Sequence, residues 1–352
     1  MRRNAGTAAM RRIIGPAAAL LMLACGVRAA AAAASDLAAY TGTDRLERLA
    51  AAARQEGQLT LYTTFAQKDL PALVQPFESK YGIRVTVWRA GTDKVLQRTL
   101  AEASAHRYSV DVVHFGAPEM EALHREKLLM PVAASGYENL RAGSVPGHHE
   151  WAPTLLSVFV QAYNTTAVSK AELPKRFEDL LDPRWKGKLG IEAKSREWYA
   201  VTVQQLGGDP GVKLFRDIVA RNGVSVRQGH ALLDNLVASG EVPLALSMYN
   251  YMPEQAKRAG APVDWFVIEP AVSRANAVGV ARHAPHPAAA LLFEEYMLSD
   301  AQPVIAGLDY VPASSRIPSP LGNVRLAPVD PERALDQNEA WSRRFDDTFV
   351  KK

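Results

Sequence analysis

The stretch EGQLTLYTTFAQKDLPALVQPFESKYGIRV, Glu56–Val85, contains the pattern that decides the fold. A strand-like run, QLTLYT, precedes a segment with apolar residues at helical spacing, namely Leu70, Leu73, Val74 and Phe77. This helix is expected to end at a glycine, after which IRV opens a second strand. A strand, a helix and a second strand form a βαβ unit, which predicts parallel pairing of the two strands.

The same alternation continues along the chain. Helices are expected over 44–56, 92–105 and 118–129, a strand over 110–116, and a second alternating region over 177–270. We therefore expect an α/β protein with two lobes, each a mainly parallel sheet flanked by helices, with ligands bound beyond the carboxyl ends of the strands. From about Pro312 the chain is rich in Pro, Arg and Asp, and we expect it to wrap the surface.

The N-terminus is typical of an export signal. Paired arginines precede an apolar run from Ile13 to Ala24 and a small-residue stretch that offers Ala-x-Ala cleavage points. Residues 1–34 are predicted to be this signal, and the protein to be periplasmic. The run is too short for a comfortable membrane span of about 20 residues. The sequence MLAC also loosely resembles a lipoprotein box, so a lipid anchor on Cys25 stays open.

Charge and cysteine content exclude several classes of protein. The whole chain has a formal charge of +4, but residues 1–34 carry five arginines and no acid. The remaining chain therefore has a formal charge of 4 − 5 = −1, which gives no reason to expect nucleic acid as a partner. The chain has one cysteine, Cys25, within the predicted signal. Without it, no disulfide, thiol nucleophile or thiolate metal site can form.

Four segments taken together resemble type II periplasmic solute-binding proteins of ABC importers, including ferric-ion and small-anion binders. They are the opening stretch 56–85, VQAYNT at 160–165, FEDLLDPRWKGKLGIE at 177–192 and GEVPLALSMYNYMPEQAKRAGAPVDW at 240–265. The resemblance covers most of residues 44–316. It implies a two-lobed fold of the periplasmic-binding-protein type, in which lobe 1 contains residues 35–157 and 272–352 and lobe 2 contains residues 158–271.

The resemblance also implies a function. The protein would be a monomer that captures a small solute, expected to be an anion, in the cleft between the lobes and delivers it to an ABC permease in the inner membrane. No catalytic residue, cofactor or metal site is expected. Two other classes stay open on the same fold: an exported enzyme, and a ligand-sensing domain that acts on a membrane receptor.

The loop between KGKLGIE and the following helix is the first candidate anion site. Free N–H groups and the positive end of a helix dipole favour an anion at the N-terminus of this helix. Ser195 and Arg196 could contact the ligand there, or could cap and solvate the helix instead. Of the two adjacent aromatic residues that follow, Trp198 and Tyr199, we expect Tyr199 to face the cleft.

Other candidates lie where strands end, because ligands bind beyond the carboxyl ends of strands in such sheets. If the strand continues to Tyr251, the side chains of Tyr249 and Tyr251 would lie on one side of it and that of Asn250 on the other. A tyrosine here could instead cover a helix, and the threonines could cap helices. The candidate residues are Thr63, Thr64, Phe65, Thr92, Tyr249, Asn250 and Tyr251.

Ferric ion is the alternative ligand. Resembling iron binders carry a histidine or tyrosine after the first strand and adjacent tyrosines in lobe 2. Here the first position has TTFAQKD, Thr63–Asp69, and the second has YNY, Tyr249–Tyr251, so an asparagine separates the tyrosines. These departures remove anionic oxygen ligands, and we therefore favour a small organic anion such as a carboxylate, phosphonate or sugar phosphate.

Overall fold

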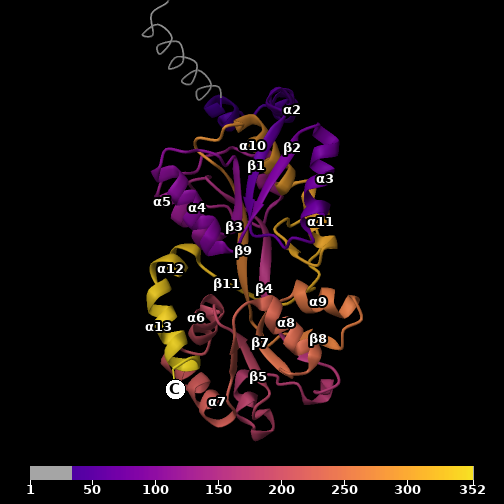
Figure 1. Cartoon of the computed structure of the whole chain (residues 1–352), viewed down its shortest axis with the longest axis vertical. Helices are drawn as coiled ribbons and strands as arrows, with labels where there is room; N and C mark the ends of the chain where they lie inside the picture. Colours follow the sequence, from indigo (N-terminus) through magenta and orange to yellow (C-terminus); the bar gives the residue numbers. More distant parts are fainter. Residues whose placement is uncertain (1–33, 352) are drawn as a thin grey trace, which may run out of the picture.

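The structure is a computed structural model that describes residues 34–351. Apart from Ala34, the predicted export signal lies outside these residues, as does Cys25. Within the described part of the chain, no helix is long and apolar enough to cross a membrane. Figure 1 shows an elongated molecule in which two groups of strands and helices lie end to end along the long axis.

Lobe 1 is built on strands in the order β2–β1–β3–β9–β4. β1 pairs in parallel with β2 and β3, as the βαβ pattern predicts, while β9 runs antiparallel to β3 and β4. Its strands are β1 (Gln58–Thr63), β2 (Arg84–Arg89), β3 (Val112–Gly116), β4 (Ala152–Asn164), β9 (Ala271–Val280), β10 (Val311–Pro312) and β11 (Leu326–Pro328). Its helices are α2 (Arg45–Glu56), α3 (Leu70–Tyr81), α4 (Thr92–Ser104), α5 (Ala117–Arg125), α10 (Pro287–Leu298) and α11 (Ala301–Gly307).

Lobe 2 continues the strand order as β4–β7–β5–β6, with β8 also paired to β4. β5 is parallel to β6 and β7, and β4 is antiparallel to β7 and β8. The elements are β5 (Leu189–Glu192), α6 (Arg196–Gln205), α7 (Asp209–Asn222), β6 (Ser225–Arg227), α8 (His230–Ser239), β7 (Leu244–Tyr249), α9 (Tyr251–Arg258) and β8 (Val263–Phe266). Short 3-10 helices cover Ser135–Asn139, Lys170–Glu172, Phe177–Leu181 and Pro183–Trp185.

The long strand β4 belongs to both lobes. Its residues from Ala152 to Val158 pair with β9, whereas those from Phe159 to Asn164 pair with β7 and β8. The predicted lobe boundary at 157/158 falls inside this strand, close to the change of partner. The stretch VQAYNT lies in the half that pairs with lobe 2. We keep the boundaries at 157/158 and 271/272 as a proposal.

Each lobe has its own apolar core, and burial of these side chains supplies the main driving force for folding. In lobe 1, the rings of Phe77 and Phe293 lie 5.0 Å apart at the centre of the core. In lobe 2, the ring of Trp198 packs against Phe177 and Phe215. Full burial of one such side chain contributes about 1.5–3 kcal/mol.

The C-terminal segment differs from the expected surface wrap. It forms two helices, α12 (Pro331–Asp336) and α13 (Asn338–Phe349), which Figure 1 draws in yellow along one side of the molecule. α12 packs on α5 of lobe 1, but α13 packs on α6 and α7 of lobe 2. The buried rings of Phe345 and Phe349 join the lobe 2 core. The assignment of all of 272–352 to lobe 1 therefore differs from this packing, because two aromatic residues one turn apart anchor α13 elsewhere.

Candidate functional site

A large cavity lies between the two lobes. Its volume is about 810 Å³, and we call it the solute cavity. Its lining includes Thr64, Arg89 and Tyr310 from lobe 1, and His230, Tyr249 and Tyr251 from lobe 2. A neighbouring cavity of about 600 Å³ shares Thr92, His230, Tyr249 and Arg274 with it. The two cavities together form a cleft between the lobes.

Several helices begin at this cleft. Thr92, His230 and Tyr251 are the first residues of α4, α8 and α9, and all three line the solute cavity. Arg196, the first residue of α6, lines the neighbouring cavity. The N-terminus of a helix carries a partial positive charge and free N–H groups, so helices of both lobes direct a field that favours an anion toward the cleft.

Cationic side chains add to this field. Lys68, Arg89 and Arg274 line the solute cavity. Arg89 ends strand β2, and its Nε donates to the carbonyl oxygen of Phe65 at 3.0 Å. Within the described residues, neither Lys68 nor Arg89 has a carboxylate within ion-pair distance. These two cations are therefore available to a ligand.

Arg274 is already held by two carboxylates. Its Nη2 lies 2.5 Å from Oε2 of Glu119, in the first turn of α5, and its Nε lies 2.6 Å from Oε2 of Glu197, in the first turn of α6. The cluster thus joins both lobes through a side chain of β9. Burial raises the pKa of the Glu119 carboxyl, and Arg274 opposes this shift.

A glycine makes room for the guanidinium of Arg274. A Cβ atom at Gly116 would lie only 2.1 Å from Nη2 of Arg274. Any side chain at this position would therefore displace the arginine from its carboxylates. This close approach explains why β3 ends with glycine.

Aromatic rings form the wall of the solute cavity. The rings of Tyr249 and Tyr251 are nearly parallel, at 8°, with centroids 6.1 Å apart, and the centroid of Tyr310 lies 4.2 Å from that of Tyr251. On the lobe 1 side, Phe65 stacks on His114 at 4.3 Å. Burial raises the pKa values of Tyr249 and Tyr251, so both phenols are neutral at physiological pH.

Six predicted ligand residues lie at the cavities. Arg196 lines the neighbouring cavity. Because β7 ends at Tyr249 and α9 begins at Tyr251, both tyrosines reach the same cavity. Five predicted residues line the solute cavity, namely Thr64, Phe65, Thr92, Tyr249 and Tyr251. Their contact with a ligand remains a prediction.

Four other predicted residues do not line either cavity. Thr63 is buried, and its Oγ1 accepts from the backbone N–H of Phe65 at 3.2 Å. Asn250 is also buried: its Nδ2 donates to the carbonyl of Asp309, and its Oδ1 accepts from the N–H of Val158. The structure does not place either residue at the cavities, because these polar groups complete backbone hydrogen bonds where strands end.

Ser195 and Tyr199 are the other two predicted residues that line neither cavity. The Oγ of Ser195 accepts from the Oγ of Ser247 at 2.7 Å and is buried against β7. Tyr199 points into the lobe 2 core, where its hydroxyl lies 2.9 Å from Oγ1 of Thr348. Trp198 is buried in the same core, so neither aromatic residue faces the cleft. The prediction missed α13, which covers Tyr199.

Sequence reasoning also missed several lining residues. Arg89 is the last residue of β2, where the rule that found Thr64 could have found it too. His114 lies in the middle of β3, and the strand pattern alone does not show that it lines the cavity. His230 and Asp234 lie in the first two turns of α8, after Gly229, and only the tertiary structure brings them to the cleft. Burial lowers the pKa of His114 to about 3, so its ring is neutral.

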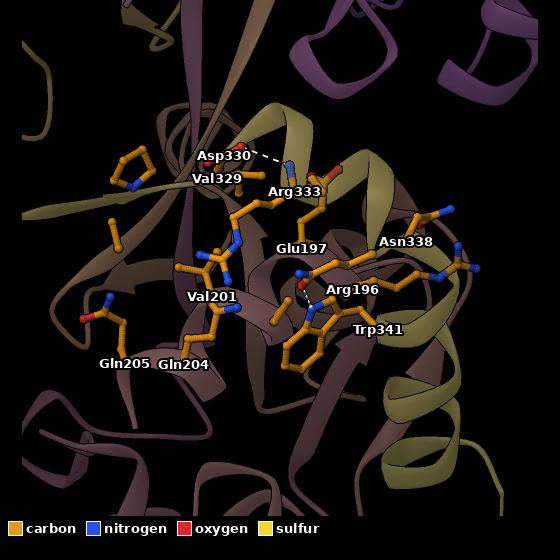
Figure 2. Close-up of a pocket in the computed structure, with 15 residues that line it drawn as sticks. Arg196, Glu197, Val201, Gln204, Gln205, Val329, Asp330, Arg333, Asn338 and Trp341 are labelled. Atoms are coloured by element: carbon orange, nitrogen blue, oxygen red, sulfur yellow. Dashed lines mark hydrogen bonds between the residues drawn. The ribbon is translucent and has the colours of Figure 1, made fainter. Parts of the chain in front are cut away.

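A third cavity lies beneath the C-terminal helices. Its volume is about 260 Å³. Figure 2 shows Val201 and Gln204 of α6 on one side, and Arg333 of α12 and Trp341 of α13 on the other. Trp341 donates from Nε1 to Oε1 of Gln337 at 3.0 Å, which holds the indole at the rim.

Comparison with known proteins identifies the family. Residues 72–319 match the family described as bacterial extracellular solute-binding proteins. This chain belongs to that family. It is a family of proteins that bind solutes outside the cytoplasm. In the described residues, no group of three or more His, Cys, Asp or Glu residues is arranged to hold a metal ion.

Curated relatives include two proteins at 24% identity. One is the Fe(3+)-binding periplasmic protein of Serratia marcescens, which matches over 206 residues, 58% of this chain and 60% of the relative. The chain therefore spans less than two thirds of that relative's length. The other is iron uptake protein A1 of Synechocystis sp., which matches over 277 residues, 73% of this chain and 75% of the relative.

Solved structures share the fold. Iron-bound HitA from Pseudomonas aeruginosa superposes with a TM-score of 0.70 at 20% identity, and the match covers 82% of this chain and 99% of HitA. AfuA from Actinobacillus pleuropneumoniae, solved with fructose-6-phosphate, gives a TM-score of 0.72 at 18% identity over 84% of this chain and 100% of AfuA. These neighbours confirm the two-lobed α/β fold of the periplasmic binding type.

Proposed function

We propose that the solute is a small organic anion, captured in the periplasm in the cleft between the lobes. One observation carries this proposal: helices of both lobes begin at a single cavity that also contains Lys68 and Arg89. The volume of about 810 Å³ suits an organic molecule better than a bare ion. The tyrosines and histidines of the wall are neutral, and the three cationic lining residues, Lys68, Arg89 and Arg274, outnumber the one acidic lining residue, Asp234.

Energetics require contacts from both lobes. Micromolar affinity corresponds to about −8 kcal/mol, and one charge-assisted hydrogen bond contributes about 1.5–3 kcal/mol. At least three such contacts and an aromatic wall are needed. Lobe 1 offers Lys68 and Arg89, and lobe 2 offers the N-termini of α8 and α9. A solute that touches both lobes favours the closed state, which the permease can recognise.

Calorimetry with a panel of carboxylates, phosphates, neutral polyols and cations tests this proposal. Arg89→Ala should weaken anion binding about tenfold or more, because one charge-assisted contact is lost. Arg84→Ala is a matched control, since Arg84 is an exposed arginine of the same strand that does not line the cavity. Tight binding of a neutral or cationic solute, or equal losses in the two variants, would contradict the proposal.

Ferric ion is the second candidate. Two phenols of the cavity wall, Tyr249 and Tyr251, lie side by side, and one curated relative is named for Fe(3+) binding and another for iron uptake. If ferric ion binds through these tyrosinates, the loaded protein should be coloured by charge transfer, and replacing both tyrosines with Phe should abolish the colour. A colourless protein after ferric loading would reject this candidate.

A further inference from the structure

Helix α8 carries two polar side chains that each have one buried atom without a hydrogen-bond partner among the described residues. His230 and Asp234 lie four residues apart, hence on one face of the helix, and both line the solute cavity. Nδ1 of His230 and Oδ1 of Asp234 are buried, and neither has a hydrogen-bond partner in the described part of the chain. A buried polar atom without a partner costs about 1–3 kcal/mol. Two such atoms on one wall of a binding cavity indicate groups that the ligand supplies.

Both atoms are hydrogen-bond acceptors. Burial lowers the pKa of His230 to about 3, so its ring is neutral and carries one N–H. Nε2 lies 3.8 Å from Oε2 of Glu192, which favours the proton on this nitrogen. Nδ1 then offers a lone pair, as does the carboxylate oxygen of Asp234. The missing partners are therefore donors.

An aromatic face lies beside these acceptors. The ring of Tyr249 is 4.3 Å from that of His230, and this surface can pack against the carbon skeleton of a ligand. The cations that suit an anionic group, Lys68 and Arg89, come from the other lobe. The cavity thus combines an anion-binding side with an acceptor side.

We propose that His230 and Asp234 accept hydrogen bonds from hydroxyl groups of the solute, so that the cargo is a hydroxylated organic anion. This inference rests on the proposed function and narrows its substrate class. A sugar acid and a sugar phosphate share the required chemistry: a negative group at one end, and hydroxyl donors along an apolar carbon skeleton.

Matched pairs of anions that differ in their hydroxyl groups test the inference. In calorimetry on the full protein, gluconate should bind more tightly than hexanoate, and glycerol 3-phosphate more tightly than propyl phosphate. The expected difference is about tenfold or more, because at least one acceptor is a charged carboxylate. The better-binding pair shows which anionic group the lobe 1 cations prefer.

Variants locate the preference on α8. His230→Phe keeps the ring beside Tyr249 but removes both nitrogens, and Asp234→Ala removes the carboxylate. Each should reduce the preference for the hydroxylated anion over its deoxy partner about tenfold. Leu232→Ala is the control, because Leu232 is an exposed residue of α8 that does not line the cavity. If Asp234→Ala fails to fold, as judged by circular dichroism, Asp234→Leu replaces it, because leucine is of similar shape and has no acceptor.

The possible outcomes separate the two proposals. Anion binding without any preference for hydroxyl groups would overturn this inference and leave the proposed function intact. So would a preference for amino-bearing anions, since the donors would then be ammonium groups. Binding of ferric ion alone, or of no anion at all, would overturn both.

Discussion

The cluster of Arg274 with Glu119 and Glu197 predicts a large effect of a nearly isosteric substitution, Glu197→Gln. The Arg274 side chain is 9% exposed, and that of Glu197 is 25% exposed. At an effective dielectric constant of about 20, unit charges about 4 Å apart attract by about 4 kcal/mol. Partial exposure of Glu197 and the loss of its repulsion with Glu119 reduce this value. We expect the free energy of unfolding to fall by about 2 kcal/mol.

Urea unfolding followed by circular dichroism measures this change. Lys194→Met is the matched control, because Lys194 pairs with Asp93 across the same cleft at 2.5 Å, but both side chains are more than half exposed. Exposed pairs contribute only about 0.2–1 kcal/mol. If Glu197→Gln costs no more than Lys194→Met, burial does not set the strength of these contacts and the reasoning fails.

Three further outcomes are expected. Burial raises the pKa of Asp234 to about 6, so protonation of this carboxyl stabilises the folded state. As the pH falls from 7 to 4, the free energy of unfolding should therefore rise by about 1–2 kcal/mol, a value that allows for solvent screening. The Asp234→Asn variant should lack this rise when its unfolding is measured over the same pH range. Tyr199→Phe should lower the thermal midpoint slightly and leave solute affinity in calorimetry unchanged. Gly116→Ala should cost about 1–3 kcal/mol in urea unfolding, and its effect should not add to that of Glu197→Gln, since both disturb Arg274.

The fold follows from local patterns in the sequence. Strand and helix periodicities between Glu56 and Val85 predicted the βαβ unit, because one face of each element has to be apolar to form a core. The C-terminal helix α13 was missed because its apolar side consists of a few residues, chiefly Trp341, Phe345 and Phe349, among many polar ones. Its position depends on a match with the lobe 2 core, which no local pattern reveals.

The candidate site could be predicted from the sequence less completely than the fold. Loops after strands were correctly expected to face the cleft, and Thr64, Phe65 and Thr92 do line the cavities. The direction of each individual side chain was harder to predict. Ser195 turns toward Ser247, which is 52 residues away in the sequence, and such long-range partners decide whether a polar group serves the fold or a ligand.

The C-terminal segment has a mechanical consequence. Only Gln337 separates α12, which packs on α5, from α13, which packs on α6 and α7. An ion pair between Arg125 of α5 and Asp336 of α12 stabilises the contact between these two helices. The tail is therefore a short tether between the two bodies of the protein, with little slack. A hinge motion that pulls α5 away from α6 would strain or detach this segment, so we expect the tail to limit how far the lobes open.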